Sequence, residues 1–403
     1  MNTLLRERLW FVFSVLVSAG AGWAWMVAGW GLLPPAGPLL SLLLIPLVIS
    51  QRSRRSRFAV ALAYYLAGSH GIPQAAAVFF GPGGHLAEGV ALWLASSVLL
   101  AAGWAFVDSG GKAIAVLLFD ALMPPLAFFD WMSPLAASGV LFPGTAWLGI
   151  ALLLMGVYLI GQWMTQGLPG AVLHTAPLWF LGVMAVLLNV MTFARAPAVP
   201  EGWRGLDLHS GPSTTSVMAN FQRMDGWMTA ADQHPRAKVI LLPETLLTWW
   251  PGNAQDVENH VPRGQTWLVG ASVPLKRGVF ADGIEAVTRR GSKMVLASAL
   301  PVPVSMWRPW HRPTGDAFGL NNYKAFWFSP VVTLAGKRVW ASICYDQLLP
   351  AIWMEAALYH PEIILLTNNE WWAKGTGIPQ IQTASSWAWG RLTGAATIEA
   401  ENR

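Results

Sequence analysis

Long apolar segments, separated by short polar or glycine- and proline-containing loops, fill roughly the first 190 residues of the chain. A helix needs about 20 mostly apolar residues to cross a bilayer, and by that measure the pattern predicts about seven spanning helices. The predicted spans cover residues 9–33, 35–49, 58–80, 85–107, 113–129, 145–164 and 171–191. We therefore expect a transmembrane domain of about seven helices over residues 1–192.

The pattern changes after residue 192, where short β-like runs alternate with helical stretches. Strands are predicted over 205–209, 237–242, 265–273, 338–343, 363–366 and 394–400, and helices over 213–233 and 349–359. This alternation is typical of a layered α/β domain. The expected fold class is therefore α + α/β, with a polytopic helical bundle followed by an α/β domain over residues 193–403.

Composition agrees with a membrane protein, because 54% of the 403 residues are hydrophobic and only 12% are charged. Soluble domains carry about 25% charged residues. The net charge of +5 suggests a nucleic-acid partner until the basic residues are located. Many of them flank apolar segments, where Lys and Arg determine topology, so we expect no direct nucleic-acid binding.

The distribution of Lys and Arg also predicts an orientation. The N-terminus and the 51–57 and 108–112 loops contain these residues, whereas the loops around 34–36, 81–84 and 130–144 contain none. This asymmetry places the N-terminus in the cytoplasm. An odd number of spans then places the C-terminal domain outside, which in a multi-pass protein of the bacterial inner membrane is the periplasm.

Three ionisable residues, His70, Glu88 and Asp120, fall inside apolar runs. Charges within a membrane are costly, so a functional role is one interpretation of each. The alternative is an interhelical hydrogen bond, or, for Glu88, a position near the interface. Nothing in the sequence pairs the three into a relay.

Candidate catalytic residues lie at the ends of predicted strands. Cys344 is the one cysteine of the chain, which excludes an intramolecular disulfide and a cysteine-based metal cluster. It precedes a predicted helix, whose N-terminus favours a thiolate. Glu244 follows another strand, and a carboxylate within reach could take the thiol proton, as in covalent acyl chemistry.

Three short segments together resemble the carbon-nitrogen hydrolase (nitrilase) superfamily. They are Leu-Leu-Pro-Glu-Thr at 241–245, Ile-Cys-Tyr-Asp at 343–346 and Leu-Thr-Asn-Asn-Glu-Trp-Trp at 366–372. Helices in front of such a domain are similar to apolipoprotein N-acyltransferase. The run Leu-Pro-Val-Pro-Val-Ser-Met-Trp at 300–307 and the Asn-Asn-Glu-Trp-Trp segment look closer still to the conjugal-transfer TraB family of bacterial plasmids.

The resemblance implies an αββα sandwich and amide cleavage or acyl transfer through a thioester. It implies that Cys344 is the nucleophile, that Glu244 is the general base, and that Asp346, Asn369 and Trp371 line the wall of the site. We expect no metal or cofactor. The expected partners are the lipid bilayer, an acyl or amide substrate derived from lipid or lipoprotein, and the conjugation machinery.

The sequence departs from the superfamily in two places. The position of the catalytic lysine, which would stabilise the oxyanion, matches Ser298, and only Lys293 or Lys324 remains as a substitute. The superfamily sandwich also continues beyond the last predicted strand, so we expect either a shortened domain or an incomplete sequence. The alternative function is therefore a catalytically inactive nitrilase-fold component of the envelope that serves conjugation by binding.

Overall fold

The computed structural model describes residues 3–27, 36–80, 85–194, 197–212, 216–311 and 322–403, except for the side chains of residues 167–174. Contacts divide the chain into two compact units. Unit 1 contains Met1–Ala196 together with Leu348–Leu358 and Gly375–Gly394. Unit 2 contains Pro197–Gln347, Tyr359–Lys374 and Ala395–Arg403. Two segments of the C-terminal half thus belong to the helical unit.

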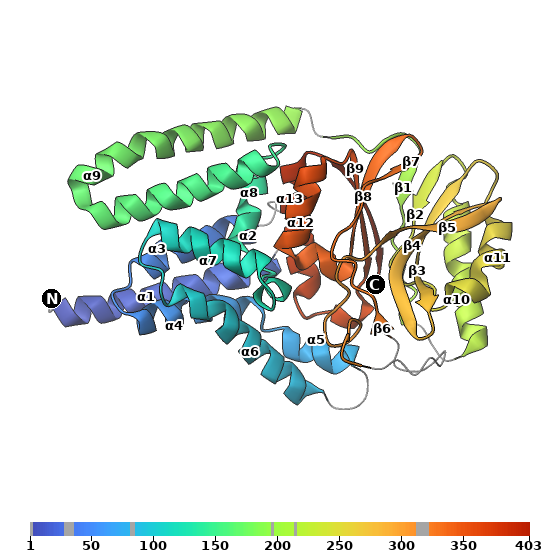
Figure 1. Cartoon of the computed structure of the whole chain (residues 1–403), viewed down its shortest axis with the longest axis horizontal. Coiled ribbons are helices and arrows are strands. Elements are labelled where there is room, and N and C mark those ends of the chain that lie inside the picture. The colour runs from blue at the N-terminus through green and yellow to red at the C-terminus, as the bar shows by residue number, and fades with distance from the viewer. Residues whose placement is uncertain (1–2, 28–35, 81–84, 195–196, 213–215, 312–321) are drawn as a thin grey trace. The chain divides into compact units, whose positions relative to one another are not determined.

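Unit 1 is helical (Figure 1). Its described α-helices are α1 (Thr3–Trp23), α2 (Ala36–Leu40), α3 (Leu44–Ile49), α4 (Arg54–Gly68), α5 (Ile72–Phe79), α6 (Leu86–Trp104), α7 (Gly110–Leu122), α8 (Ala137–Leu141), α9 (Trp147–Ala194), α12 (Pro350–Tyr359, as far as Leu358) and α13 (Ile378–Thr393). Its 3₁₀ turns are η1 (Ala24–Val27), η2 (Ser41–Leu43), η3 (Leu126–Phe128) and η4 (Pro134–Ala136).

Four helices among the described residues are long and apolar enough to cross a membrane. They cover Leu4–Val27, Leu86–Trp104, Trp147–Gln166 and Thr175–Ala194. Only 11% of the most apolar window of Thr175–Ala194 is buried inside the protein, so most of its side chains face outward. An apolar helix with an apolar outer surface is stable in lipid rather than in water. These helices support membrane association.

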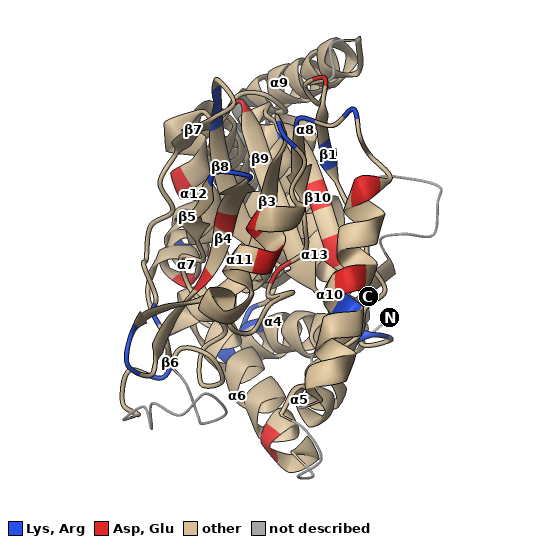
Figure 2. Ribbon diagram, turned by 90° about the vertical axis from the view of Figure 1, so that its right-hand side faces the viewer, with Lys and Arg blue, Asp and Glu red and all other residues tan. Residues whose placement is uncertain are grey.

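Helix α9 folds back on itself, and Figure 1 shows its two arms running alongside each other. A Cβ atom at Gly156 in the first arm would lie 3.6 Å from Leu181 Cδ1 in the second. A straight helix would separate these residues by about 37 Å, at 1.5 Å per residue. The arms correspond to the spans predicted over 145–164 and 171–191, and no charged residue lies along them (Figure 2).

Three other predicted spans are shorter in the structure. The 35–49 segment is divided among α2, η2 and α3, and the 58–80 segment is divided between α4 and α5. The 113–129 segment contains the end of α7 and the turn η3. Proline explains the last two boundaries. Pro73 lies in the first turn of α5, where proline is favoured, and Pro124 follows the C-cap of α7, because proline disfavours helix in the residue before it. The loop predicted at 81–84, and that at 34–36 except its last residue, lie outside the described residues.

Small residues and buried indoles hold unit 1 together. Trp25 Nε1 donates to Tyr64 Oη at 2.9 Å, and Tyr64 Oη donates to the Met132 carbonyl at 2.7 Å. Helix α8 contacts α13 through Gly139, where a Cβ atom would lie 1.7 Å from the Ala388 carbonyl oxygen. Close backbone approach through small residues is the usual packing of membrane helices. The C-terminal helix α13 is thereby fixed to the N-terminal helices.

Unit 2 contains two β-sheets. Sheet A has strands β1 (Trp203–Gly205), β2 (Val239–Leu241), β3 (Thr266–Lys276), β4 (Val279–Thr288) and β5 (Gly291–Ala297) in that order, and β6 (Asn322–Tyr323) pairs with β4. Sheet B has the order β10 (Ala396–Asn402), β9 (Ile363–Asn369), β8 (Lys337–Ile343) and β7 (Val332–Leu334). Parallel pairs join β1, β2 and β3 in one sheet and β8, β9 and β10 in the other.

Two apolar cores organise unit 2. One core joins residues from both sheets, including Leu241 and Leu268 of sheet A and Ile343 and Leu365 of sheet B, so the sheets face each other. The other lies between sheet A and the helices α10 (Val217–Asp232) and α11 (Trp250–His260). Figure 1 shows these helices on the same face of that sheet, and Figure 2 shows that they carry charged side chains. The prediction of apolar helices followed by a mixed-sheet domain is confirmed at this level.

The Gly139 contact generates a stability prediction. Gly139→Ala introduces a methyl group against the Ala388 backbone, so we expect a loss of about 1–3 kcal/mol of unfolding free energy. Gly182→Ala in α9 is the matched control, because a Cβ atom at Gly182 would meet nothing within 4 Å; it should stabilise the helix slightly. Thermal unfolding in detergent measures both. Equal melting temperatures for Gly139→Ala and the wild type would contradict the proposed packing of α8 on α13.

Candidate active site

Cys344 lies at the point where strand β8 ends and the short helix η5 (Cys344–Leu348) begins. Its φ angle is +47°, in the left-handed region that residues other than glycine seldom adopt. The residue is 9% exposed. Backbone strain of this kind is kept only where the surrounding structure enforces it, and it is frequent at functional sites.

Glu244 follows strand β2 and is only 4% exposed. Its carboxyl group and the Cys344 thiol are hydrogen-bonded to each other. The second carboxyl oxygen, Oε2, is buried and has no hydrogen-bond partner among the described residues. The structure therefore brings together the two residues that the strand-end argument singled out, although they belong to different sheets.

Glycine at position 270 fixes the turn that carries Glu244. A Cβ atom there would lie 2.2 Å from the Pro243 carbonyl oxygen and 2.6 Å from the Glu244 Cα. The Gly270 carbonyl in turn accepts a hydrogen bond from the Leu246 N–H at 2.9 Å. Strand β3 thus passes so close beneath the turn that any side chain at this position would displace the glutamate.

Asp282, in the middle of β4, is a member of the site that the sequence did not reveal. Its carboxyl group is hydrogen-bonded to that of Glu244 and accepts a hydrogen bond from Thr245 Oγ1 at 3.1 Å. Burial raises the pKa of Asp282 to about 6. Burial, and then the Asp282 charge, raise the pKa of Glu244 well above its ordinary value. Two carboxyls in contact resist simultaneous ionisation, so the pair retains a proton.

The sequence concealed Asp282 for a local reason. It precedes Gly283, and an Asp-Gly pair is typical of a turn rather than of a strand. The structure instead places this pair inside a ten-residue antiparallel strand. Alternation of apolar and polar residues along β4 was the available signal, but it is weak in the run from Phe280 to Ala286.

Ser298 and Asp346 lie on the side of the site formed by the end of β5. The Ser298 N–H donates to the Asp282 carbonyl at 2.8 Å, and its hydroxyl is buried without a hydrogen-bond partner among the described residues. Asp346 accepts hydrogen bonds from the N–H groups of Ala299 at 2.9 Å and Leu300 at 2.8 Å. Burial raises the pKa of Asp346 to about 7, although these hydrogen bonds oppose the rise. Asp346 therefore ties the loop after β5 to the turn after Cys344.

The two lysines named as substitutes for the missing lysine lie elsewhere. Lys293 is exposed on β5, five positions before Ser298, which corresponds to about 16 Å along a strand. Lys324 is also exposed, and its ammonium group lies 4.5 Å from the centre of the Phe326 ring. The largest influences on the pKa of the Cys344 thiol are burial and the charges of Glu244, Asp282 and Glu370, and neither lysine is among them.

The segment after β9 contributes a further carboxyl group. Asn369 Oδ1 accepts a hydrogen bond from Asn402 Nδ2 at 2.9 Å, so it links β9 to β10, and Trp371 is half-buried at the start of η6 (Trp371–Ala373). Between them, Glu370 is 8% exposed, and its charge acts on the Cys344 thiol. Burial raises the pKa of Glu370 to about 8. The sequence pointed to this segment but not to the glutamate within it.

Tyr323 and Ser272 extend the polar group toward β3. Their hydroxyl groups are hydrogen-bonded at 2.6 Å. Burial, and the negative charges of Asp282 and Glu244, raise the pKa of Tyr323 to about 12. Tyr323 therefore remains a neutral phenol that can donate a hydrogen bond. Nothing in the sequence around 322–323 suggested this role.

Acidic residues have the main electrostatic influence on the thiol. The largest charge effects on its pKa come from Glu244, Asp282 and Glu370. Burial, followed by the Glu244 charge, raises the pKa of Cys344 well above its ordinary value. The sequence led us to expect a thiolate favoured by the following helix, and the structure gives the opposite. One short helix end is outweighed by burial and by like charges.

These features define a class of protein in which apolar helices long enough to cross a membrane are joined to a two-sheet domain that buries a hydrogen-bonded thiol and carboxyl. No family model matches the chain. It is 30% identical to "Conjugal transfer protein TraB" of Agrobacterium fabrum (strain C58 / ATCC 33970), over 100% of this chain and 95% of that protein. It is 29% identical to "Probable conjugal transfer protein TraB" of Sinorhizobium fredii (strain NBRC 101917 / NGR234), over 96% of each.

The chain therefore belongs to the family of the conjugal transfer protein TraB. This confirms the resemblance to that family that the sequence suggested.

The Asp282 environment predicts a pH-dependent change in stability. Its raised pKa means that the folded state binds the proton more tightly, so this contribution is fully present below about pH 4 and is lost as pH rises through about 6. Asp282→Asn removes the cost of the buried charge, which is of the order of 3 kcal/mol. We expect the variant to melt above the wild type at pH 8, and the difference to shrink toward pH 4.

Thermal unfolding in detergent at several pH values tests this, with Asp256→Asn on the exposed surface of α11 as the control. A variant that is destabilised equally at every pH would show that the hydrogen bond from Thr245, rather than the charge, determines the role of Asp282.

Proposed function

We propose that the chain is a membrane-bound enzyme of the carbon-nitrogen hydrolase (nitrilase) type. It cleaves an amide or transfers an acyl group through a thioester at Cys344, in support of plasmid conjugal transfer. The buried hydrogen bond between the Cys344 thiol and the Glu244 carboxyl supports the chemistry most directly. The conjugal-transfer relatives support the biological role.

The architecture of unit 2 agrees with this proposal. Two facing sheets share one core, and α10 and α11 cover the outer face of sheet A. We propose that the domain over residues 193–403 is a nitrilase-like αββα sandwich. The ends of β2 and β8, which carry the glutamate and the cysteine, then correspond to the segments in which the resemblance expects the base and the nucleophile.

In the proposed reaction, the proton that the Glu244–Asp282 pair retains lies on Asp282, and the ionised Glu244 takes the proton of the Cys344 thiol as the sulfur attacks the carbonyl carbon of the substrate. The tetrahedral intermediate collapses when the C–N bond breaks, and Glu244 returns the proton to the leaving amine. Water or another amine then attacks the thioester and gives its proton to Glu244, and the thiol is regenerated. A carboxyl with a raised pKa suits this role, because its basicity is closer to that of the thiol.

The oxyanion of the intermediate lacks the lysine that the resemblance expects. Ser298 offers a hydroxyl donor at the matching position instead of an ammonium group. Losing one oxyanion donor costs about 10²–10³ in rate. We therefore propose a slow enzyme, or one whose substrate carries its own positive charge or an activated acyl group.

We further propose that the protein is a multi-pass component of the bacterial inner membrane, with the N-terminus in the cytoplasm and unit 2 in the periplasm. The four apolar helices support membrane association. The orientation rests on the basic residues, such as Arg52, Arg54 and Arg55, in loops on one side.

A non-catalytic role is the second candidate. In that case the domain keeps the fold and serves the conjugation machinery as a binding component of the envelope. The observations that favour it are the serine at the lysine position and the thiol whose pKa is raised well above its ordinary value by burial and the Glu244 charge.

An acylation assay separates the two candidates. We expect the purified full-length protein, incubated with a p-nitrophenyl ester, to gain an acyl group that intact-protein mass spectrometry maps to Cys344 and that neutral hydroxylamine removes. Cys344→Ala should abolish the adduct, and Glu244→Gln should slow its formation about 10²–10⁴-fold because the base is lost. Asp256→Asn, on the exposed surface of α11, should behave as the wild type.

Plasmid transfer from donor to recipient bacteria provides the biological readout. We expect Cys344→Ala and Glu244→Gln to lower transfer frequency at unchanged protein levels. The absence of an adduct on the wild type, combined with normal transfer by Cys344→Ala, would refute the enzyme proposal in favour of the binding component.

A further inference from the structure

Unit 1 buries two carboxyl groups whose role is independent of Cys344. Asp120 lies near the end of α7 and is 3% exposed, and Asp130 lies in the turn after η3 and is 1% exposed. Each has one oxygen, Oδ2, that is buried without a hydrogen-bond partner among the described residues. A buried carboxyl oxygen without a hydrogen-bond partner is energetically unfavourable, so the presence of two such oxygens in the helical unit requires an explanation.

The two carboxyls lie close enough for the charge of Asp120 to act on Asp130. Asp120 also interacts with the Trp104 indole, and Asp130 with the Ser133 hydroxyl. The remaining titratable groups near the carboxyls are two phenols of α4. The charges of both carboxyls act on Tyr65, and the charge of Asp130 acts on Tyr64. Within the described part of the chain, no Lys, Arg or His acts on either carboxyl.

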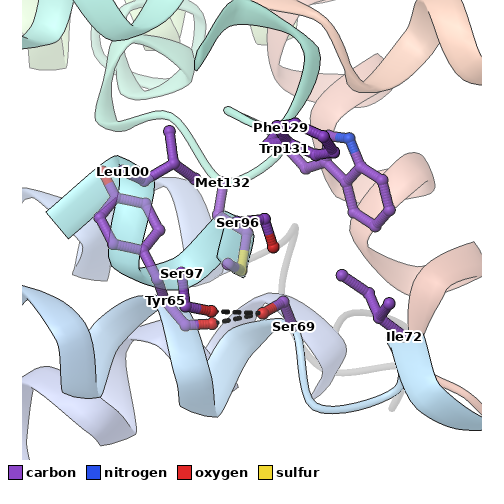
Figure 3. A pocket seen from close by; sticks show the side chains of 9 residues that line it. All are labelled: Tyr65, Ser69, Ile72, Ser96, Ser97, Leu100, Phe129, Trp131 and Met132. Carbon is purple, nitrogen blue, oxygen red and sulfur yellow. Dashed lines mark hydrogen bonds between the residues drawn. The ribbon is translucent and has the colours of Figure 1, made fainter. Parts of the chain in front are cut away.

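Tyr65 also lines a small cavity (Figure 3). Its volume is about 10 Å³, which is enough for one water molecule. Hydroxyl groups of Ser69, Ser96 and Ser97 line it from α6 and from the segment between α4 and α5, together with Tyr65, Phe129, Trp131 and Met132. The Ser69 and Ser97 hydroxyls are hydrogen-bonded at 3.4 Å. Tyr65, on whose phenol both carboxyl charges act, and Phe129 and Trp131, the sequence neighbours of Asp130, connect the carboxyls to this cavity.

Electrostatics limits what state this pair can adopt. Moving one carboxylate from water to an apolar interior is strongly unfavourable, and a second nearby charge of the same sign adds to the cost. A cation must therefore accompany the pair. A proton is the smallest such cation, and a single carboxyl oxygen is enough to bind it, whereas a metal cation is the alternative that the experiment below separates.

We propose that Asp120 and Asp130 form a proton-binding site inside the helical unit, and that the pair retains a proton at neutral pH. The neighbouring cavity provides room for a water molecule through which the proton is exchanged. Any conformational or transport step that is coupled to proton binding requires such a site, one that takes up and releases a proton within the membrane-associated unit. The site is separate from the proposed chemistry at Cys344.

Infrared spectroscopy of the full-length protein in lipid vesicles tests the proposal. We expect the spectrum of the wild type minus that of the double variant to contain a carboxylic-acid C=O band at pH 7–8, and each single variant, Asp120→Asn or Asp130→Asn, to retain carboxylic-acid absorption that the double variant lacks. The same difference band should appear when both spectra are recorded in a Glu244→Gln background, so the result does not depend on the proposed enzyme function. Asp108→Asn is the matched control, because Asp108 is exposed and paired with Lys112 at 2.8 Å.

Identical spectra for the wild type and the double variant at pH 7–8 would overturn the proposal, since both carboxyls would then be ionised. Loss of the band on addition of sodium ions at constant pH would also overturn it, because the occupant would be a metal cation. Circular dichroism determines whether the double variant is folded. If it is not folded, the two single variants still test the proposal, because each should have weaker carboxylic-acid absorption or a shifted band relative to the wild type.

Discussion

Burial of carboxyl groups without basic partners is the constraint on which both units of this protein depend. In unit 2, Glu244 and Asp282 share a hydrogen bond beside the Cys344 thiol, and in unit 1 Asp120 and Asp130 lie together among apolar helices. Such groups avoid the cost of desolvated charge only by retaining protons or by pairing with a cation. The chemistry open to each site is therefore the chemistry of proton transfer.

The two-sheet scaffold holds the thiol and the carboxyl in place against this cost. The shared core between the sheets brings the ends of β2 and β8 together, and Gly270 lets β3 pass directly beneath the glutamate turn. Asp346 fixes the opposite side through two backbone hydrogen bonds. The left-handed backbone at Cys344 shows that this framework is rigid enough to maintain local strain.

The acidic surroundings of Cys344 bear on which substrate a TraB-family protein could act on. Ser298 occupies the position where a lysine was expected, and the main charges that act on the thiol are acidic. In the proposed reaction, a base with a raised pKa suits a thiol whose own pKa is raised by burial. Under that proposal, a positively charged substrate would supply the stabilisation that the lysine gives elsewhere in the superfamily.

The sequence by itself determined the apolar helices, most of the strands and the positions of Cys344 and Glu244 at strand ends, because hydrophobic periodicity and turn residues act locally. It did not determine that α12 and α13 join the helical unit, or that Asp282 and Glu370 surround the thiol. It also did not show that Asp120 lies close enough to Asp130 for its charge to act on it. Contacts and desolvation depend on residues distant in the chain, so only the tertiary structure decided that the thiol is protonated rather than ionised.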